Sequence, residues 1–169
     1  MPEPLDPEAL FRVLARHQVR YVLIGGLAAV LHGSSALTND ADICPERSPA
    51  NLERLAAALR EMGARIRASA EPDGLPFDCD AMLLARMKMV NLSTRHGDFD
   101  LSFEPAASAG YEDLVARAIP FDIGGTQVLV ASLADIIRSK EAADRPKDRA
   151  TLPILRALED EIARQSGEA

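Results

Sequence analysis

The chain has 169 residues, of which 47% are hydrophobic and 27% are charged. This length and composition fit one globular domain with a substantial core and exclude a disordered chain. The formal net charge of -7 argues against a surface built for non-specific DNA binding, which needs a broad basic face. We therefore expect a single domain over residues 1–169.

Neither export nor membrane insertion is indicated. The first residues, MPEPLDPEAL, contain no basic start followed by an apolar stretch, and no later segment approaches about 18 uninterrupted apolar residues. We expect a cytoplasmic protein with no membrane partner. Cys44 and Cys79 have neither the number nor the spacing of a disulfide framework or a zinc site, so we expect both to pack in the core.

The first third of the chain alternates helices and strands. Asp6 followed by Pro7 is an N-cap with proline at the first helical position, and Ser48-Pro49 repeats that pattern. The predicted elements are a helix at 6–17, a strand at 20–24, a short helix at 27–32 and a helix at 48–63.

The rest of the chain adds a hairpin, a second hairpin and two helices. Residues 64–88 give a weak signal, with EPDGLPFD (71–78) predicted as a loop and DAMLLA (80–85) as one helical turn or more. The later predicted elements are strands at 87–93 and 97–103, a helix at 111–118, strands at 120–123 and 126–130, a helix from Ser132 through Lys140, and a last helix carrying Leu155, Leu158 and Ile162. Pro153 either kinks that last helix or starts it. These elements predict a mixed sheet flanked by helices, in the α+β or α/β range.

Two aspartates lie one residue apart in TNDADIC, residues 38–44, which otherwise has the composition of a buried strand. On a strand, Asp40 and Asp42 would share a face about 6–7 Å apart, and they would repel by about 2–3 kcal/mol at an effective dielectric near 20. A cation or a proton should therefore offset their charge, and Mg²⁺ or Mn²⁺ suits such oxygen ligands. The alternative is that both are exposed loop residues after a turn at Thr38-Asn39.

A second acidic row occurs in GDFDLSF, residues 97–103. Asp98 and Asp100 alternate there with Phe99 and Leu101, so the carboxylates face away from an apolar side. If the two acidic strands meet, three carboxylates would hold two divalent ions, an arrangement suited to in-line displacement at phosphorus. The alternative is the solvated face of an edge hairpin.

Two further features favour phosphate binding. Gly25-Gly26, between a strand and a helix, would let backbone approach a phosphate closely, although most such pairs are only turns. Lys140 takes a core-facing position in its helix, and residues 138–149 carry five basic and three acidic residues in a chain of net negative charge. This segment is the best local candidate for holding a triphosphate, although a single such lysine is commonly a snorkelling stem.

Taken together, these segments resemble a known family. VLIGGLAAVLHGSSALTNDADIC resembles the first signature of the DNA polymerase beta-type nucleotidyltransferase superfamily, and FDLSF resembles its third-carboxylate strand. KEAADRPKD is similar to the basic motif of small bacterial nucleotidyltransferases, including the AbiEii and MenT type toxins. The matches span residues 22–148.

The resemblance implies a role for each matching residue. It implies that Gly25 and Gly26 contact the nucleotide phosphates and that Thr38 fits the nucleotide-binding pattern. It implies that Asp40, Asp42 and Asp100 bind the metals, with Asp98 as the rival of Asp100. It also implies that Lys140 neutralises phosphate charge with help from Arg145 and Lys147, and that Asp148 orients this cluster. Two positions depart from the family: Ala36 stands where relatives often have arginine, and Thr151 where they often have an acidic residue.

The resemblance also implies an activity. It predicts a nucleotidyltransferase-like fold with a catalytic core at about 20–130 and a C-terminal helical part at about 131–165. The implied reaction, dependent on Mg²⁺ or Mn²⁺, transfers a nucleoside monophosphate from an NTP to an acceptor hydroxyl. The acceptors to expect are a tRNA end or a protein side chain, then a small antibiotic, and a toxin would have an antitoxin partner. The alternatives are an inactive binding module of the same fold acting in a complex, and a purely structural cation site.

Overall fold

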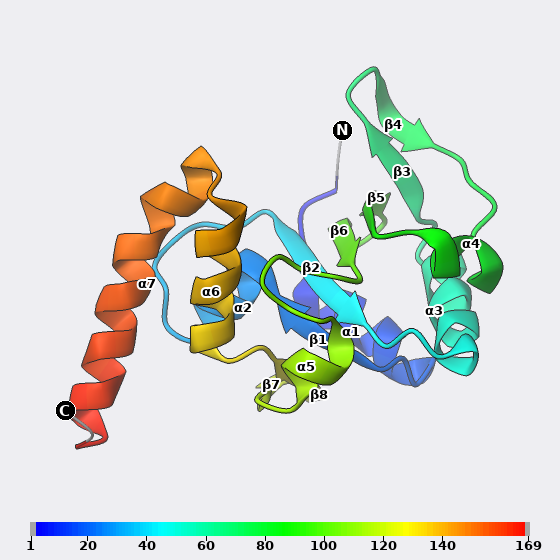
Figure 1. Ribbon diagram of the computed structural model, residues 1–169. Helices are drawn as coiled ribbons and strands as arrows, with labels where there is room; N and C mark the ends of the chain where they lie inside the picture. The colour runs from blue at the N-terminus through cyan, green and yellow to red at the C-terminus, as the bar shows by residue number, and fades with distance from the viewer. Residues whose placement is uncertain (1–2, 168–169) are drawn as a thin grey trace.

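The structure is a computed structural model that describes residues 3–167, and it shows a mixed α+β fold (Figure 1). The strands are β1 (Tyr21–Ile24), β2 (Asp40–Pro45), β3 (Arg65–Ala68), β4 (Glu71–Leu75), β5 (Met89–Thr94), β6 (Gly97–Ser102), β7 (Ile119–Ile123) and β8 (Thr126–Val130). The helices are α1 (Pro7–Arg16), α2 (Gly25–Leu31), α3 (Pro49–Glu61), α4 (Ala81–Arg86), α5 (Tyr111–Val115), α6 (Leu133–Ala143) and α7 (Pro146–Gln165). The predicted fold class is confirmed.

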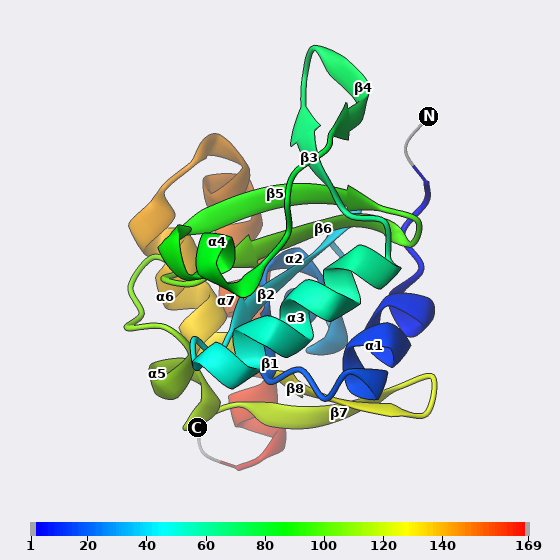
Figure 2. The same cartoon turned by 90° about the vertical axis from the view of Figure 1, so that its right-hand side faces the viewer.

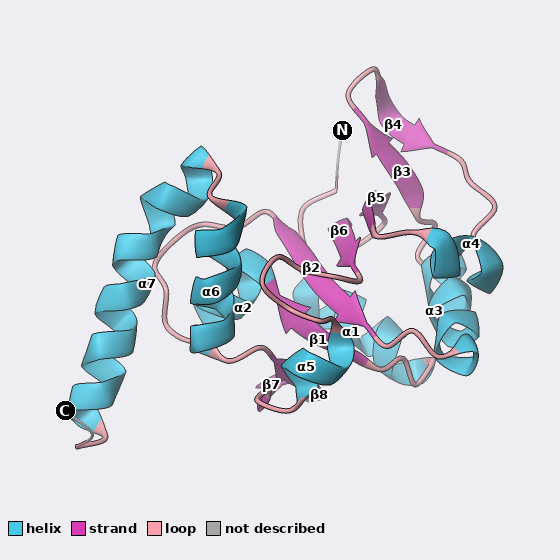
Figure 3. Ribbon diagram, in the orientation of Figure 1, coloured by secondary structure: helices cyan, strands magenta, loops and turns pink. Residues whose placement is uncertain are grey.

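All the strands join one sheet in the order β4-β3-β5-β6-β2-β1-β8-β7. The pairs β2–β6 and β1–β8 are parallel, and the other neighbours are antiparallel. Figure 2 shows α1 and α3 on the near face of the sheet, with α6 and α7 behind it. Figure 3 shows β2 near the middle of the sheet, between α6 on one side and the β3–β4 hairpin on the other.

The predicted starts of α1, α3 and α6 are confirmed by their caps, whereas the short helix predicted at 27–32 begins earlier, at Gly25, without a side-chain cap. The Asp6 carboxylate accepts a hydrogen bond from the Ala9 amide at 3.1 Å, and the Ser48 hydroxyl accepts one from the Asn51 amide at 3.3 Å. Each cap satisfies an amide that the first helical turn leaves free. Ser132 caps α6 in the same way. These caps fix the start of the helices that cover the sheet.

The segment 64–88 corrects the sequence prediction. EPDGLPFD was predicted as a loop, but its first five residues form β4, which pairs with β3. Only Gly74 of β4 is buried, so the strand has none of the alternation that a sequence pattern can reveal. A Cβ at Gly74 would lie 2.9 Å from the Ile66 carbonyl oxygen, which explains the glycine there.

Pro153 does not start the last helix. Helix α7 begins at Pro146, and Pro153 lies inside it without an amide for the Arg149 carbonyl. Cys44 and Cys79 are buried free thiols, as predicted. Within residues 3–167, no helix is both long enough and apolar enough to cross a membrane.

Candidate active site

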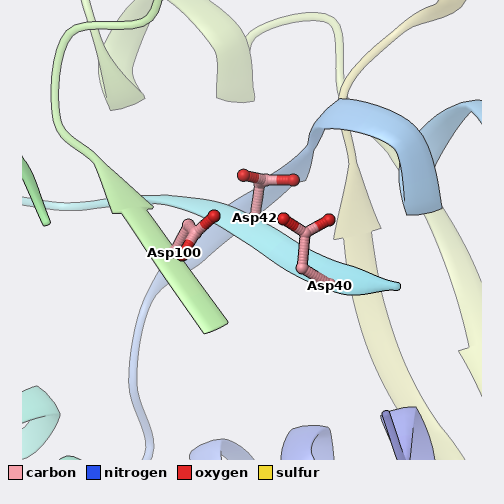
Figure 4. A group of neighbouring side chains, drawn as sticks. All are labelled: Asp40, Asp42 and Asp100. Atoms are coloured by element: carbon pink, nitrogen blue, oxygen red, sulfur yellow. The ribbon is translucent and has the colours of Figure 1, made fainter. Parts of the chain in front are cut away.

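Strands β2 and β6 bring the acidic side chains together. They pair in parallel with Asp40 opposite Asp98 and Asp42 opposite Asp100. Asp40, Asp42 and Asp100 each offer a carboxylate oxygen, and these oxygens all lie within 4.8 Å of one another (Figure 4). Asp40 and Asp42 are therefore not exposed loop residues, and Asp98 and Asp100 do not lie on an edge hairpin, since β2 and β6 are inner strands of the sheet. Both alternatives are wrong.

This carboxylate group is costly to charge. Burial raises the pKa of Asp42 to about 7, with further increases from Asp40 and Asp100, against the lowering effect of Lys147 and Lys140. Burial likewise raises the pKa of Asp100 to about 6, and Arg67 opposes that rise. Such shifts arise where carboxylates are buried close together, and a cation between these carboxylates would offset the cost of charging them.

The chemistry of the group fits a divalent cation. Asp100 is only 8% exposed, and its Oδ1 is buried without a hydrogen bond. Buried polar atoms are normally satisfied, and a carboxylate oxygen that accepts no hydrogen bond can instead coordinate a cation. Three carboxylates that converge on one point are the oxygen ligands that Mg²⁺ and Mn²⁺ prefer. Asp40, Asp42 and Asp100 are thus the residues that could hold the ion.

Arg67, on β3, contacts the carboxylates and was not singled out from the sequence. Its Nη1 lies 3.0 Å from Asp98 Oδ2. Its Nη2 lies 3.0 Å from Asp100 Oδ1 but donates its hydrogen bond to Oδ2, at 3.1 Å. The repulsion between carboxylates did predict a nearby cation. Arg67 could not be singled out, because β3 lies in residues 64–88, where the sequence gives the weakest secondary-structure signal.

The glycine pair lies directly against the carboxylate strand. Gly25 has φ +73°, and a Cβ there would lie 2.5 Å from Asp42 Oδ2. A Cβ at Gly26 would lie 3.0 Å from Thr38 Oγ1, and that hydroxyl donates a hydrogen bond to the Asp40 carbonyl at 3.1 Å. Glycine is therefore required here so that α2 can pack against β2, whatever else the pair binds.

The basic cluster at the α6–α7 turn is organised by a buried acid. Asp148 is fully buried and accepts hydrogen bonds from Arg145 Nε at 2.7 Å and from the Arg145 amide at 3.1 Å. Lys140 Nζ lies 3.5 Å from Asp148 Oδ1. Asp148 thereby holds Lys140 and Arg145 in one place, while Lys147 next to it is exposed. The Thr151 hydroxyl donates to the Lys147 carbonyl at 2.9 Å.

One pocket of about 780 Å³ contains both the carboxylates and the basic cluster. Every predicted site residue except Asp148 lines it: Gly25, Gly26, Thr38, Asp40, Asp42, Asp100, Lys140, Arg145 and Lys147. Ala36 and Thr151, the two departures from the family pattern, line it as well. The lining also includes residues that the sequence did not single out, among them Leu37, Arg67, Met89 and Asn91. The structure thus brings together residues that are far apart in the chain.

Comparison with known proteins gives a likeness of structure rather than of sequence. No family profile and no curated protein matches the chain. The lincosamide antibiotic adenylyltransferase LnuA, in its lincomycin-bound structure, shares 14% identity with a TM-score of 0.59, over 92% of this chain and 99% of that one. A proposed nucleotidyltransferase of Thermotoga maritima shares 16% identity with a TM-score of 0.54, over 94% and 97%.

The antibiotic-resistance factor ANT(2'')-Ia, in complex with adenylyl-2''-tobramycin, gives 16% identity and a TM-score of 0.51, over 95% of each chain. At such identities the likeness concerns the fold alone. The chain therefore shares the fold of these three proteins, and it carries a candidate carboxylate triad at Asp40, Asp42 and Asp100.

Proposed function

We propose that the protein is a nucleotidyltransferase, dependent on Mg²⁺ or Mn²⁺, that transfers a nucleoside monophosphate from an NTP to an acceptor hydroxyl. The observation that carries the proposal is the pocket itself. It sets three carboxylate oxygens within 4.8 Å of one another, and a lysine and arginine cluster lines the same pocket. Phosphoryl transfer relies on this combination of positioning and charge neutralisation.

The carboxylates would hold the metal. Asp40 and Asp42 present adjacent ligands from β2, and Asp100 presents the third from β6. When bound, the ions would neutralise the phosphate oxygens and activate the attacking hydroxyl. A structural cation site would not need a phosphate-binding cluster in the same pocket, and for this reason we favour catalysis.

The basic cluster would hold the leaving end of the triphosphate. Lys140 and Arg145, oriented by Asp148, and the exposed Lys147 provide charge on the side of Asp42. Arginine and lysine bind phosphate oxygens well because they donate charge-assisted hydrogen bonds. Gly25 and Gly26 line the pocket beside them, and the Thr38 hydroxyl donates a hydrogen bond to the carbonyl of Asp40, the first residue of β2.

The proposed chemical step is a single displacement. The acceptor oxygen forms a bond to the α-phosphorus, and the bond between that phosphorus and the oxygen that bridges to the β-phosphate breaks. Pyrophosphate leaves with the electron pair of that bond. The hydroxyl proton passes to Asp100, the triad carboxylate that lies on β6, next to β5. The pocket would also exclude water and hold the reacting groups in line.

The acceptor is a separate part of the proposal. A tRNA end or a protein side chain follows from the resemblance of KEAADRPKD to toxin-type enzymes, and would make the protein a toxin with an antitoxin partner. A small molecule is supported by LnuA and ANT(2'')-Ia, whose structures contain lincomycin and adenylyl-tobramycin.

Incubation with each α-³²P-labelled NTP, Mg²⁺ and a mixture of acceptors tests the activity. We expect labelled product and pyrophosphate with the wild type, none with Asp40→Asn, and normal activity with Asp160→Asn, an exposed aspartate on α7. The proposal is wrong if the wild type transfers no label from any NTP and binds nucleotide no better than Asp40→Asn.

A further inference from the structure

The half of the pocket next to β5 is built differently from the half next to α6. We define the β5 half by six lining residues: Arg67, Met89, Asn91, Asp98, Asp100 and Ser102. In the register of β5 and β6, Met89 lies opposite Ser102 and Asn91 opposite Asp100. Opposite residues point to the same face, so these side chains flank the third carboxylate.

The acceptor must approach from this half if the proposed function is correct. In an in-line displacement the attacking oxygen and the leaving pyrophosphate lie on opposite sides of the phosphorus. Lys140, Arg145 and Lys147, which would hold the pyrophosphate, come from α6, the turn after it and the start of α7. Figure 1 shows α6 beside α2 on one side of β2, and β5 with the β3–β4 hairpin on the other. The β5 half is thus the side of the attacking oxygen.

The charges of the β5 half do not suit a polyanion. Among the described residues that line this half, Arg67 is the only cation, and both arms of its guanidinium are taken by Asp98 and Asp100. Asp100 would be occupied by the metal, and the charges of Arg67 and Asp98 cancel, so this half has no surplus positive charge. Nucleic acid is held mainly through phosphate contacts with free lysines and arginines. A tRNA end would find no free cation there.

The same residues suit a small amine-bearing molecule. The side chain of Asp98 is 27% exposed, and Arg67 engages its Oδ2, which leaves Oδ1 to meet an ammonium group. Met89 is 64% exposed and offers apolar surface, and the exposed amide of Asn91 both donates and accepts hydrogen bonds. The whole pocket of about 780 Å³ also has to hold the NTP, so the remaining space favours a small acceptor.

We propose that the acceptor is a small hydroxyl compound that carries an amine, bound in the β5 half with its ammonium group on Asp98 and its apolar part on Met89. The proposal rests on the proposed function and names its substrate class. The reaction is the displacement described above, with the acceptor hydroxyl as the attacking group.

Binding measurements with three probes test this inference. Tobramycin and lincomycin represent amine-bearing hydroxyl compounds, and total tRNA represents a polyanion. Each is titrated into the full chain with Mg²⁺ and a non-hydrolysable NTP. We expect an amine-bearing probe to bind. Its Kd should rise roughly tenfold in Asp98→Asn, because that variant loses one charge-assisted hydrogen bond. Met89→Ala should also weaken it, whereas Asp160→Asn and Met82→Ala, at an exposed methionine on α4 outside the pocket, should not.

The outcomes separate this inference from the proposed function. Metal-dependent NTP binding that is lost in Asp40→Asn supports the proposed function whatever the probes do. The inference is overturned if neither amine-bearing probe binds, if binding ignores both Asp98→Asn and Met89→Ala, or if tRNA binds and receives the label instead.

Discussion

Replacement of Asp42 by asparagine should stabilise the metal-free protein. Burial, Asp40 and Asp100 raise the pKa of Asp42 from 3.8 to about 7 in the folded state. The folded protein therefore holds a proton that the unfolded chain has lost, and stability falls as the pH rises from about 4 to about 7. Above pH 7 the ionised group costs up to about 4 kcal/mol, at 1.36 kcal/mol for each pKa unit. Asp42→Asn removes this cost.

The assay is thermal unfolding in EDTA at pH 8 and at pH 4. For a chain of this length, a gain of about 4 kcal/mol raises Tm by roughly 8–16 °C. We expect the gain at pH 8, little difference at pH 4, and no difference at either pH for Asp160→Asn. Mg²⁺ should stabilise the wild type but not Asp42→Asn, because binding to the folded state alone adds stability. An Asp42→Asn protein that is less stable than wild type at pH 8 in EDTA would refute this reasoning.

Four further predictions follow from the same contacts. Gly25→Ala should destabilise the protein by about 1–3 kcal/mol in thermal unfolding and abolish transfer, because its Cβ would lie 2.5 Å from Asp42 Oδ2 at a positive φ; an unchanged Tm would contradict the close packing. Asp148→Ala should weaken NTP binding in calorimetry and cost about 2 kcal/mol of stability, since Arg145 and Lys140 lose their shared buried partner; unaltered NTP affinity would separate this cluster from the nucleotide. Mn²⁺ affinity measured by electron paramagnetic resonance should fall as the pH drops through 7 and 6, because Asp42 and Asp100 then take up protons; a flat profile would place the ion elsewhere. Arg67→Met should move the midpoint of that profile to higher pH, because Arg67 opposes the raised pKa of Asp100; a midpoint at lower pH would mean that Arg67 mainly repels the ion.

The carboxylate strands could be predicted because each carries a strong local pattern. In β6 the acidic residues alternate with Phe99 and Leu101, which are fully buried, and the pattern fixes which face the acids occupy. The cap residues Asp6 and Ser48 act within a few residues of themselves, so their role is visible in the sequence too.

Arg67 could not be predicted, because its role depends on partners in a distant strand. β3 is partly exposed along its whole length, and β4 beside it has one buried residue, so neither shows a periodic pattern. Arg67 comes near Asp98 and Asp100 only because β3 pairs with β5 in the folded sheet. The glycine pair shows a related limit: its position predicted a close approach, but its contact with Asp42 became visible only in three dimensions.

The most direct test of the central claim is a crystal of the protein grown with Mn²⁺ and a non-hydrolysable NTP. Anomalous scattering locates the ions independently of any assumed acceptor. We predict a manganese peak between Asp40, Asp42 and Asp100, with the triphosphate extending toward Lys140. No manganese at these carboxylates, or a nucleotide bound elsewhere, would contradict the account.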